Sequence, residues 1–252
     1  MNMEEQIEKI IRTSIQENPM FPKTERPSGT VKIPEIPSED GDDEKTVKEA
    51  YVASPKTYSQ VSELVSDKTK EEHVKLYQGY VDKLNEVSAK IDTADRQGAN
   101  CNESDYRALK IDEAYLHNAV YLHEMYFANC FDPHSEVFMD SLAYLRLERD
   151  FGTFADWQKD FMACAASNRE GWVICGYSMF LKRYINTFVD SHSTGMMLGL
   201  IPVIVVDTWS HSFYKDYMAD RKSYIVAMMR ELNWEIIEER TKKVDDIHKV
   251  NQ

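Results

Sequence analysis

Three histidines and one aspartate are the side chains of this sequence with the clearest capacity for chemistry. Asp207 ends an apolar segment, and His211 follows four residues later, about one helical turn further on. His73 and His123 lie upstream, each in a long segment of helical pattern. A carboxylate beside three neutral imidazoles suits a redox-active first-row metal. The spacing alone is weak evidence, because a pair of the form Asp-x-x-x-His is more often a structural hydrogen bond.

The elements that must position these residues follow from the hydrophobic pattern. Ser66 or Asp67 is a candidate N-cap for a helix that continues through Lys90. Further helices are expected over 103–131, 136–149, 153–167, 211–231 and 233–243, with one or two strands in 172–189 and another at 201–207. Helices come first, then a small sheet, then helices again. This order predicts an α+β fold rather than repeated βαβ units.

The composition is that of an acidic protein. The 252 residues include 43 acidic and 30 basic side chains, which gives a formal net charge of −13. This balance argues against general nucleic-acid binding, which needs a basic surface. The longest apolar run, residues 198–206, is far shorter than the roughly 20 residues of a membrane-spanning helix. Residues 1–10 do not form a secretory signal, so we expect a cytoplasmic protein with no membrane or nucleic-acid partner.

Residues 1–55 differ from the rest of the chain. They hold six of the eight prolines and an acidic run at 39–44. Isoleucines at 7, 10, 11 and 15 fit one face of a short helix. We interpret the segment as an extension, with a short helix and an extended arm, that binds a protein partner or docks on the chain's own body. A solvated tail is an equally good interpretation.

The residues around Asp207 resemble a family signature. Residues 207–217 read D-T-W-S-H-S-F-Y-K-D-Y, similar to the D-x-W-E-H-A-Y-Y-x-D-Y of the iron/manganese superoxide dismutases. Other segments resemble that family in the same order, namely 122–127, 151–157, 171–172 and 233–234. The resemblance covers roughly residues 60–240. It implies an N-terminal α-hairpin of two long helices, 56–132, then a C-terminal α/β part, 133–252, with a small antiparallel sheet of three strands flanked by helices.

The resemblance also implies a metal site and a reaction. His73, His123, Asp207 and His211 would bind one iron or manganese ion per subunit, with a solvent molecule in the fifth position. The reaction would convert superoxide to dioxygen and hydrogen peroxide. His73 and Tyr80 are seven residues apart, where the family has eight. A helix that lacks a one-residue bulge of the usual kind accounts for this difference.

Further residues are assigned by the same resemblance. Tyr80 resembles the family's gateway tyrosine, and His192 falls where a side chain hydrogen-bonds the metal-bound solvent; a polar loop histidine is the alternative for His192. Side chains around the metal would be Tyr77, Tyr126, Phe127, Trp172, Trp209 and Tyr214, for which simple core packing is the alternative. Lys75 and Arg221 match the positions that attract the superoxide anion, although either also fits a solvated surface base.

One departure bears on assembly and on activity. The family's glutamate before the last ligand histidine reaches the partner subunit's ligand histidine, and here Ser210 stands in its place. We expect a homodimer or higher oligomer with a changed interface. Two functions remain: an active dismutase with a partner-binding arm, or a structural or assembly protein with the dismutase fold and a retained or vestigial metal site. Two departures from the family are the reasons to keep the second function. They are Ser210 and Tyr77, which is a substitution near the gateway tyrosine Tyr80.

Overall fold

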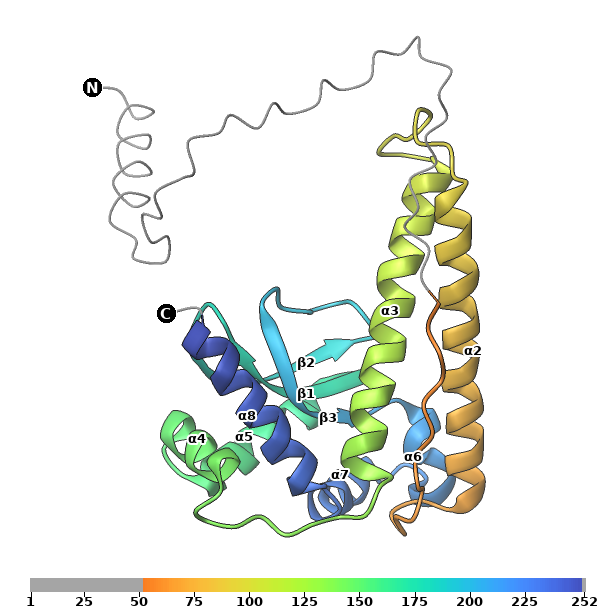
Figure 1. Cartoon of the computed structure of the whole chain (residues 1–252). Coiled ribbons are helices and arrows are strands. Elements are labelled where there is room, and N and C mark those ends of the chain that lie inside the picture. The colour runs from red at the N-terminus through yellow and green to blue at the C-terminus, as the bar shows by residue number, and fades with distance from the viewer. Residues whose placement is uncertain (1–51, 251–252) are drawn as a thin grey trace, which may run out of the picture. The chain divides into compact units, whose positions relative to one another are not determined.

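The first part of the structure is a helical hairpin. The computed structural model describes residues 52–250, so the expected helix in residues 3–17 and the arm with its partner lie outside it. The helices α2 (Asp67–Asp92) and α3 (Asp105–Cys130) pack side by side (Figure 1). Ser66 Oγ accepts the N–H of Thr69 and caps α2, as predicted. The helix α2 is α-helical throughout, without a bulge, which agrees with the seven-residue spacing of His73 and Tyr80.

The second part contains an antiparallel sheet of three strands in the order β2-β1-β3. Its strands are β1 (Gly171–Ser178), β2 (Arg183–Asp190) and β3 (Leu200–Asp207). Every residue of the central strand β1 is buried. Trp172 on β1 pairs with Asp207 at the end of β3, which brings an aromatic ring to the predicted metal site. The α+β prediction and the three-stranded sheet are confirmed.

Gly171 explains why β1 can start where it does. A Cβ atom at this position would lie 1.9 Å from the carbonyl oxygen of Val189 and 2.9 Å from the amide nitrogen of Ser191. Only a glycine permits so close an approach of the two strands. The glycine therefore fixes the neighbouring Trp172 at the end of the sheet.

Five further helices complete the described chain. They are α4 (Leu142–Phe151), α5 (Phe154–Ser167), α6 (Ser210–Tyr217), α7 (Arg221–Arg230) and α8 (Trp234–Val250). The single helix predicted over 211–231 is wrong, because the chain breaks between α6 and α7. Met218 has a φ of +51°, and the side chain of Asp220 accepts the N–H of Ser223 to start α7. The helix predicted from 136 begins instead at Leu142, after Ser141 as its cap.

The elements up to Asp246 pack as one compact unit. In it α3 lies against β3, α5 against β1 and β2, and α6 against α2 (Figure 1). The boundary expected after residue 132 falls in the loop between α3 and α4. Among the described residues, no helix combines the length and the apolar character needed to cross a membrane.

Residues 53–62 run along the hairpin and are hydrogen-bonded to both of its helices. The N–H of Ala53 donates to Asn85 Oδ1 at 2.7 Å. The N–H of Lys56 donates to Tyr77 Oη at 3.0 Å, and Tyr77 Oη in turn donates to Glu124 Oε1 at 2.9 Å. Tyr77 is fully buried, so its hydroxyl connects the segment, α2 and α3 inside the protein.

Replacing Tyr77 by phenylalanine should lower the free energy of unfolding by about 1–2 kcal/mol, because the Lys56 N–H and the Glu124 carboxylate lose a shared partner. Urea unfolding of the full chain measures this. Tyr121→Phe is the matched control, since Tyr121 is 42% exposed. Equal unfolding midpoints for the two variants would rule out the structural role of the Tyr77 hydroxyl.

Candidate metal centre

Four elements bring His73, His123, Asp207 and His211 together. They lie on α2, on α3, at the last position of β3 and in the first turn of α6. The potential ligand atoms of the four side chains are all within 4.8 Å of one another. Asp207 Oδ2 lies 3.1 Å from His73 Nε2 and 3.4 Å from His211 Nε2. All the side chains except His211 are buried; that of His211 is 32% exposed.

Buried polar atoms without partners make this cluster fit a cation. His73 Nε2, His123 Nε2 and Asp207 Oδ2 have no hydrogen bond, although two of them are close enough for an ion pair. Unpaired polar atoms in a protein interior are costly. Ligand atoms about 2.1 Å from a shared ion stand about 3–4 Å apart, and the distances from Asp207 Oδ2 to His73 Nε2 and His211 Nε2 fall in this range. Three imidazole nitrogens and one carboxylate oxygen suit a first-row transition metal.

Hydrogen bonds on the far sides of these ligands orient them. The Nδ1–H of His123 donates to the carbonyl oxygen of Ala119 at 2.6 Å, which leaves the Nε2 lone pair free. Asp207 Oδ1 accepts the N–H of Trp209 at 2.7 Å, so that Oδ2 faces the histidines. The free Nε2 of His123 and the free Oδ2 of Asp207 thus face the cluster.

His192 and Tyr80 lie next to the cluster. The indole N–H of Trp172 donates to His192 Nδ1 at 3.0 Å. Since an indole nitrogen can only donate, Nδ1 must be the acceptor and the proton of the neutral ring sits on Nε2. His192 Nε2 lies 3.3 Å from Tyr80 Oη. His192 lies in the turn after β2, as the loop alternative also has it, and its side chain is fully buried.

Aromatic rings surround the cluster. Ring centres lie 5.1 Å apart for His73 and Phe127, and 4.8 Å apart for His123 and Trp172. The ring centres of three further predicted side chains also lie near those of the histidines. The distances are 5.4 Å for Tyr126 and His73, 6.2 Å for Tyr77 and His123, and 5.9 Å for Trp209 and His211. Tyr214 is 57% exposed and lies on the outer surface of α6. Tyr214 therefore does not line the cluster, whereas the other five rings pack around it.

Comparison with known proteins agrees with this geometry. Residues 141–240 match the family model described as iron/manganese superoxide dismutases, C-terminal domain. The chain is 36% identical over 170 residues to the protein named superoxide dismutase [Fe] of Aquifex pyrophilus, which covers 66% of this chain and 79% of the relative. This chain belongs to the iron/manganese superoxide dismutase family. It is also 32% identical over 161 residues to superoxide dismutase [Mn] 2 of Halobacterium salinarum, covering 64% of this chain and 78% of that protein.

Burial and charge set the protonation of the cluster in this dismutase-family chain. Burial lowers the pKa of His73, lowers that of His123 to about 3 and lowers that of His192 to about 4. Burial opposes the charged form of Asp207 too, but the adjacent His211 and His73 outweigh it and hold its pKa well below the usual range. The Asp207 charge likewise raises the pKa of His211 against the effect of burial.

Acid should therefore destabilise the metal-free protein. Below about pH 6.5 the unfolded chain binds protons at His123 and His192 that the folded chain does not bind, so these groups lower the free energy of unfolding as the pH falls towards 4 and then 3. The raised pKa of His211 acts in the opposite direction, but it is one group against three histidines whose pKa is lowered. Protons also compete with metal for the same nitrogens. Urea midpoints at about pH 7 and about pH 5 measure the effect. His117→Gln, at an exposed position, should keep the same pH dependence, whereas midpoints that do not change with pH in the parent chain would contradict this account.

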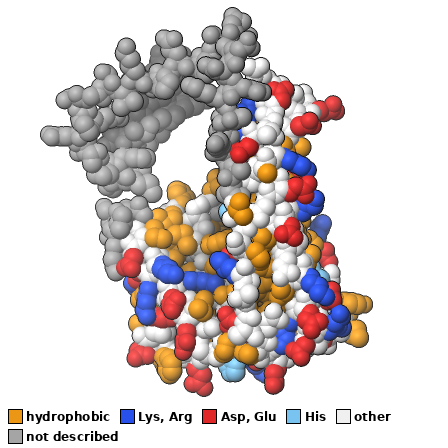
Figure 2. Space-filling view, turned by 45° about the vertical axis from the view of Figure 1, so that its right-hand side comes forward, with side chains coloured by type: hydrophobic (Ala, Val, Ile, Leu, Met, Phe, Trp, Pro, Cys, Tyr) orange, Lys and Arg blue, Asp and Glu red, His pale blue; other side chains and the backbone are white. Residues whose placement is uncertain are grey.

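The two bases expected to attract superoxide have nearby partners. Lys75 Nζ lies 3.1 Å from Glu72 Oε1, which also binds Lys68. Arg221 donates to the carbonyl oxygens of Asn168 and Arg169 at 2.9 and 3.1 Å. Figure 2 shows acidic and basic side chains interleaved along the hairpin. Steering of superoxide by Lys75 and Arg221 stays a prediction. The guanidinium of Arg221 also holds the loop at Asn168 and Arg169 through these hydrogen bonds.

Residues that the sequence did not single out also shape the centre. Tyr224 Oη donates to the carbonyl oxygen of Asp207 at 2.9 Å and lies 3.1 Å from Tyr126 Oη. Asn118 Nδ2 donates to the carbonyl oxygen of His192 at 2.9 Å. Tyr224 and Asp207 are 17 residues apart in the sequence, and Asn118 and His192 are 74 residues apart. No local spacing therefore indicates these contacts.

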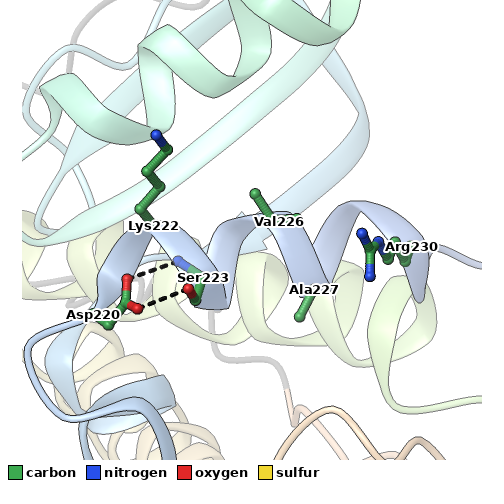
Figure 3. Close-up of a pocket in the computed structure, with 6 residues that line it drawn as sticks. All are labelled: Asp220, Lys222, Ser223, Val226, Ala227 and Arg230. Atoms are coloured by element: carbon green, nitrogen blue, oxygen red, sulfur yellow. Dashed lines mark hydrogen bonds between the residues drawn. The ribbon is translucent and has the colours of Figure 1, made fainter.

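A separate hollow lies along α7 (Figure 3). It is lined by Asp220, Lys222, Ser223, Val226, Ala227 and Arg230. Asp220 accepts hydrogen bonds from the N–H and Oγ of Ser223 at 3.0 and 2.7 Å, which caps the helix. The hollow shares no residue with the histidine cluster, and its carboxylate is already engaged.

Proposed function

We propose that this protein is an iron- or manganese-dependent superoxide dismutase. The reaction takes two superoxide anions and two protons to one dioxygen and one hydrogen peroxide. The observation that carries the proposal is the convergence of three imidazoles and a carboxylate within 4.8 Å, with free atoms facing inward. The names of the relatives, superoxide dismutase [Fe] and [Mn], support the same chemistry.

His73, His123 and His211, each through Nε2, and Asp207 through Oδ2 would hold the ion. The ion, when bound, supplies the electron transfer, accepting one electron from one superoxide and returning it to another. One carboxylate among three neutral imidazoles leaves a bound cation with net positive charge, which favours an anionic substrate. The aromatic rings limit the volume beside the ligands to small molecules and exclude water that would weaken this attraction.

Protons reach the centre, in this proposal, from the hydroxyl of Tyr80, which His192 positions. Burial raises the pKa of Tyr80 to about 12, so its hydroxyl holds a proton at neutral pH. The Nε2–H of His192 lies beside that hydroxyl and has a fixed direction because Trp172 occupies Nδ1. With a pKa lowered to about 4, His192 stays neutral and donates a hydrogen bond without taking up a second proton. His192 therefore positions Tyr80, and Tyr80 is the group that carries the transferable proton.

Metal analysis of the purified full chain, followed by a superoxide-disappearance assay, tests the proposal. We expect one iron or manganese ion per chain and superoxide decay in proportion to the metal bound, with both lost in His123→Ala. A protein that holds the metal and leaves superoxide decay at its uncatalysed rate would contradict the enzyme and favour the structural or assembly role.

A further inference from the structure

Glu124 directly follows the cluster residue His123 on α3, but its side chain has a different set of partners. Successive residues of a helix are turned by about 100°, so Glu124 points in a different direction from His123. Its carboxylate accepts the hydroxyl of Tyr77 at 2.9 Å and forms a short ion pair with Lys56. Its carbonyl oxygen accepts the hydroxyl of Tyr58 at 3.4 Å. Glu124 therefore connects the helix that carries His123 with α2 and with the segment that precedes α2.

Tyr77 is the group through which Glu124 reaches the cluster. The ring of Tyr77 is fully buried, and its centre lies 6.2 Å from that of His123 and 5.6 Å from that of Phe127. Its hydroxyl accepts the N–H of Lys56 and donates to Glu124. A hydroxyl with both a donor and an acceptor in place fixes the far end of the ring. The imidazole of His123 thus lies beside a ring whose position depends on the Glu124 carboxylate.

The two bonds of the Glu124 carboxylate differ in what they contribute. A hydrogen bond from the Tyr77 hydroxyl to a carboxylate is charge-assisted and about twice as strong as one between neutral groups. The ion pair with Lys56 contributes less, because the lysine side chain is 63% exposed. It offsets, however, the charge of a carboxylate whose side chain is only 16% exposed. The position of the Tyr77 ring therefore depends mainly on the hydrogen bond.

Residues 53–62 contact the same group of rings. The ring centre of Tyr58 lies 5.2 Å from that of Phe127, and the ring centre of Phe127 lies 5.8 Å from that of His123. Because the hydroxyl of Tyr58 also donates to the carbonyl oxygen of Glu124, the segment meets α3 on both a ring and the backbone. The surroundings of His123 thus depend on a segment that lies outside the helical hairpin.

We propose that Glu124 is a positioning residue of the metal centre, which holds the ring of Tyr77 beside His123 and ties it to residues 53–62. The inference rests on the proposed function and deepens it, since it adds a carboxylate that acts on a metal-binding histidine through a neighbouring ring. Without this carboxylate the Tyr77 hydroxyl loses its acceptor, and the ring can move away from His123. His123 would then hold a bound ion in a less fixed orientation, which should show both in the rate of metal loss and in the spectrum of the metal.

The first test measures how fast the manganese-loaded full chain loses its metal to a chelator. Glu124→Ala should release the metal about 10-fold faster than the parent, at the lower end of the effect of residues behind a ligand. Glu113→Ala is the matched control and should release it at the parental rate, because Glu113 is also on α3, is 21% exposed and pairs with a lysine. Glu124→Gln should stay close to the parental rate, since the amide oxygen can accept the Tyr77 hydroxyl. Equal rates for Glu124→Ala and Glu113→Ala, or a glutamine variant as fast as the alanine variant, would overturn the proposal.

The second test separates positioning from a loss of stability. The electron paramagnetic resonance spectrum of bound Mn²⁺ depends on ligand geometry, so it should change in Glu124→Ala and keep the parental form in Glu113→Ala. Adding Glu124→Ala to a Tyr77→Phe chain should change neither the spectrum nor the release rate further, because the hydroxyl through which Glu124 acts is already absent. An unchanged spectrum in Glu124→Ala, or a full additional effect in the double variant, would overturn the proposal. A parent chain that binds no metal, or binds it and is inert, would instead contradict the proposed function.

Discussion

Asp207→Asn should weaken manganese or iron binding by at least about 100-fold, since loss of a ligand is expected to exceed the 10–100-fold effect of changes behind the ligands. Asp207 supplies the only carboxylate of the four-residue cluster, and its Oδ2 faces two of the three histidines. An amide in its place keeps the shape and the bond from the Trp209 N–H but removes the negative charge. Superoxide decay should fall with the metal content.

A chelator competition titration measures the affinity, and circular dichroism confirms that the variant folds. Asp140→Asn, which removes an exposed carboxylate, is the control and should bind metal like the parent. A folded Asp207→Asn protein with parental metal affinity would show that the ion binds elsewhere.

His192→Ala should lower the turnover of superoxide by about 100-fold while the metal content stays close to one per chain, because proton transfer by a positioned group typically contributes about 10²–10⁴-fold. The substitution removes the Nε2–H beside Tyr80 and also leaves the buried indole N–H of Trp172 without its acceptor.

The matched variant is His192→Gln. A glutamine amide has an oxygen that can accept the Trp172 N–H and an NH₂ that can donate towards Tyr80, so it should restore most of the lost turnover. Turnover at equal metal content is the readout for both variants. A glutamine variant as slow as the alanine variant would indicate that His192 has a task other than donating this hydrogen bond.

The four cluster residues were implied by the family resemblance, and the regular elements that carry them could be predicted from the sequence pattern. His73, Tyr77 and Tyr80 share one face of a plain helix, and the continuity of α2 preserves that face. Asp207 ends an apolar strand, and His211 follows in the first turn of the next helix. Periodicity and chain order predict the elements, and the family resemblance implied which of their residues bind the metal.

The residues that support the centre could not be predicted in the same way. Tyr77 and Glu124 are 47 residues apart in the sequence, and their hydrogen bond depends on how α2 and α3 pack against each other. Met218 shows the same limit at the level of the backbone, because it has a positive φ without a glycine or proline to indicate the break. Arg221 was expected to attract superoxide or to be a solvated surface base, and its hydrogen bonds to nearby carbonyl oxygens were not foreseen. Each depends on tertiary contacts that a local pattern does not contain.

The central claim is that His73, His123, Asp207 and His211 hold a redox-active ion. A crystal structure of the full chain, with anomalous scattering data on both sides of the iron and manganese absorption edges, tests it most directly. We predict a single iron or manganese peak per chain, bordered by the three Nε2 atoms and by Asp207 Oδ2. A cluster without such a peak, in protein that contains iron or manganese, would contradict the account.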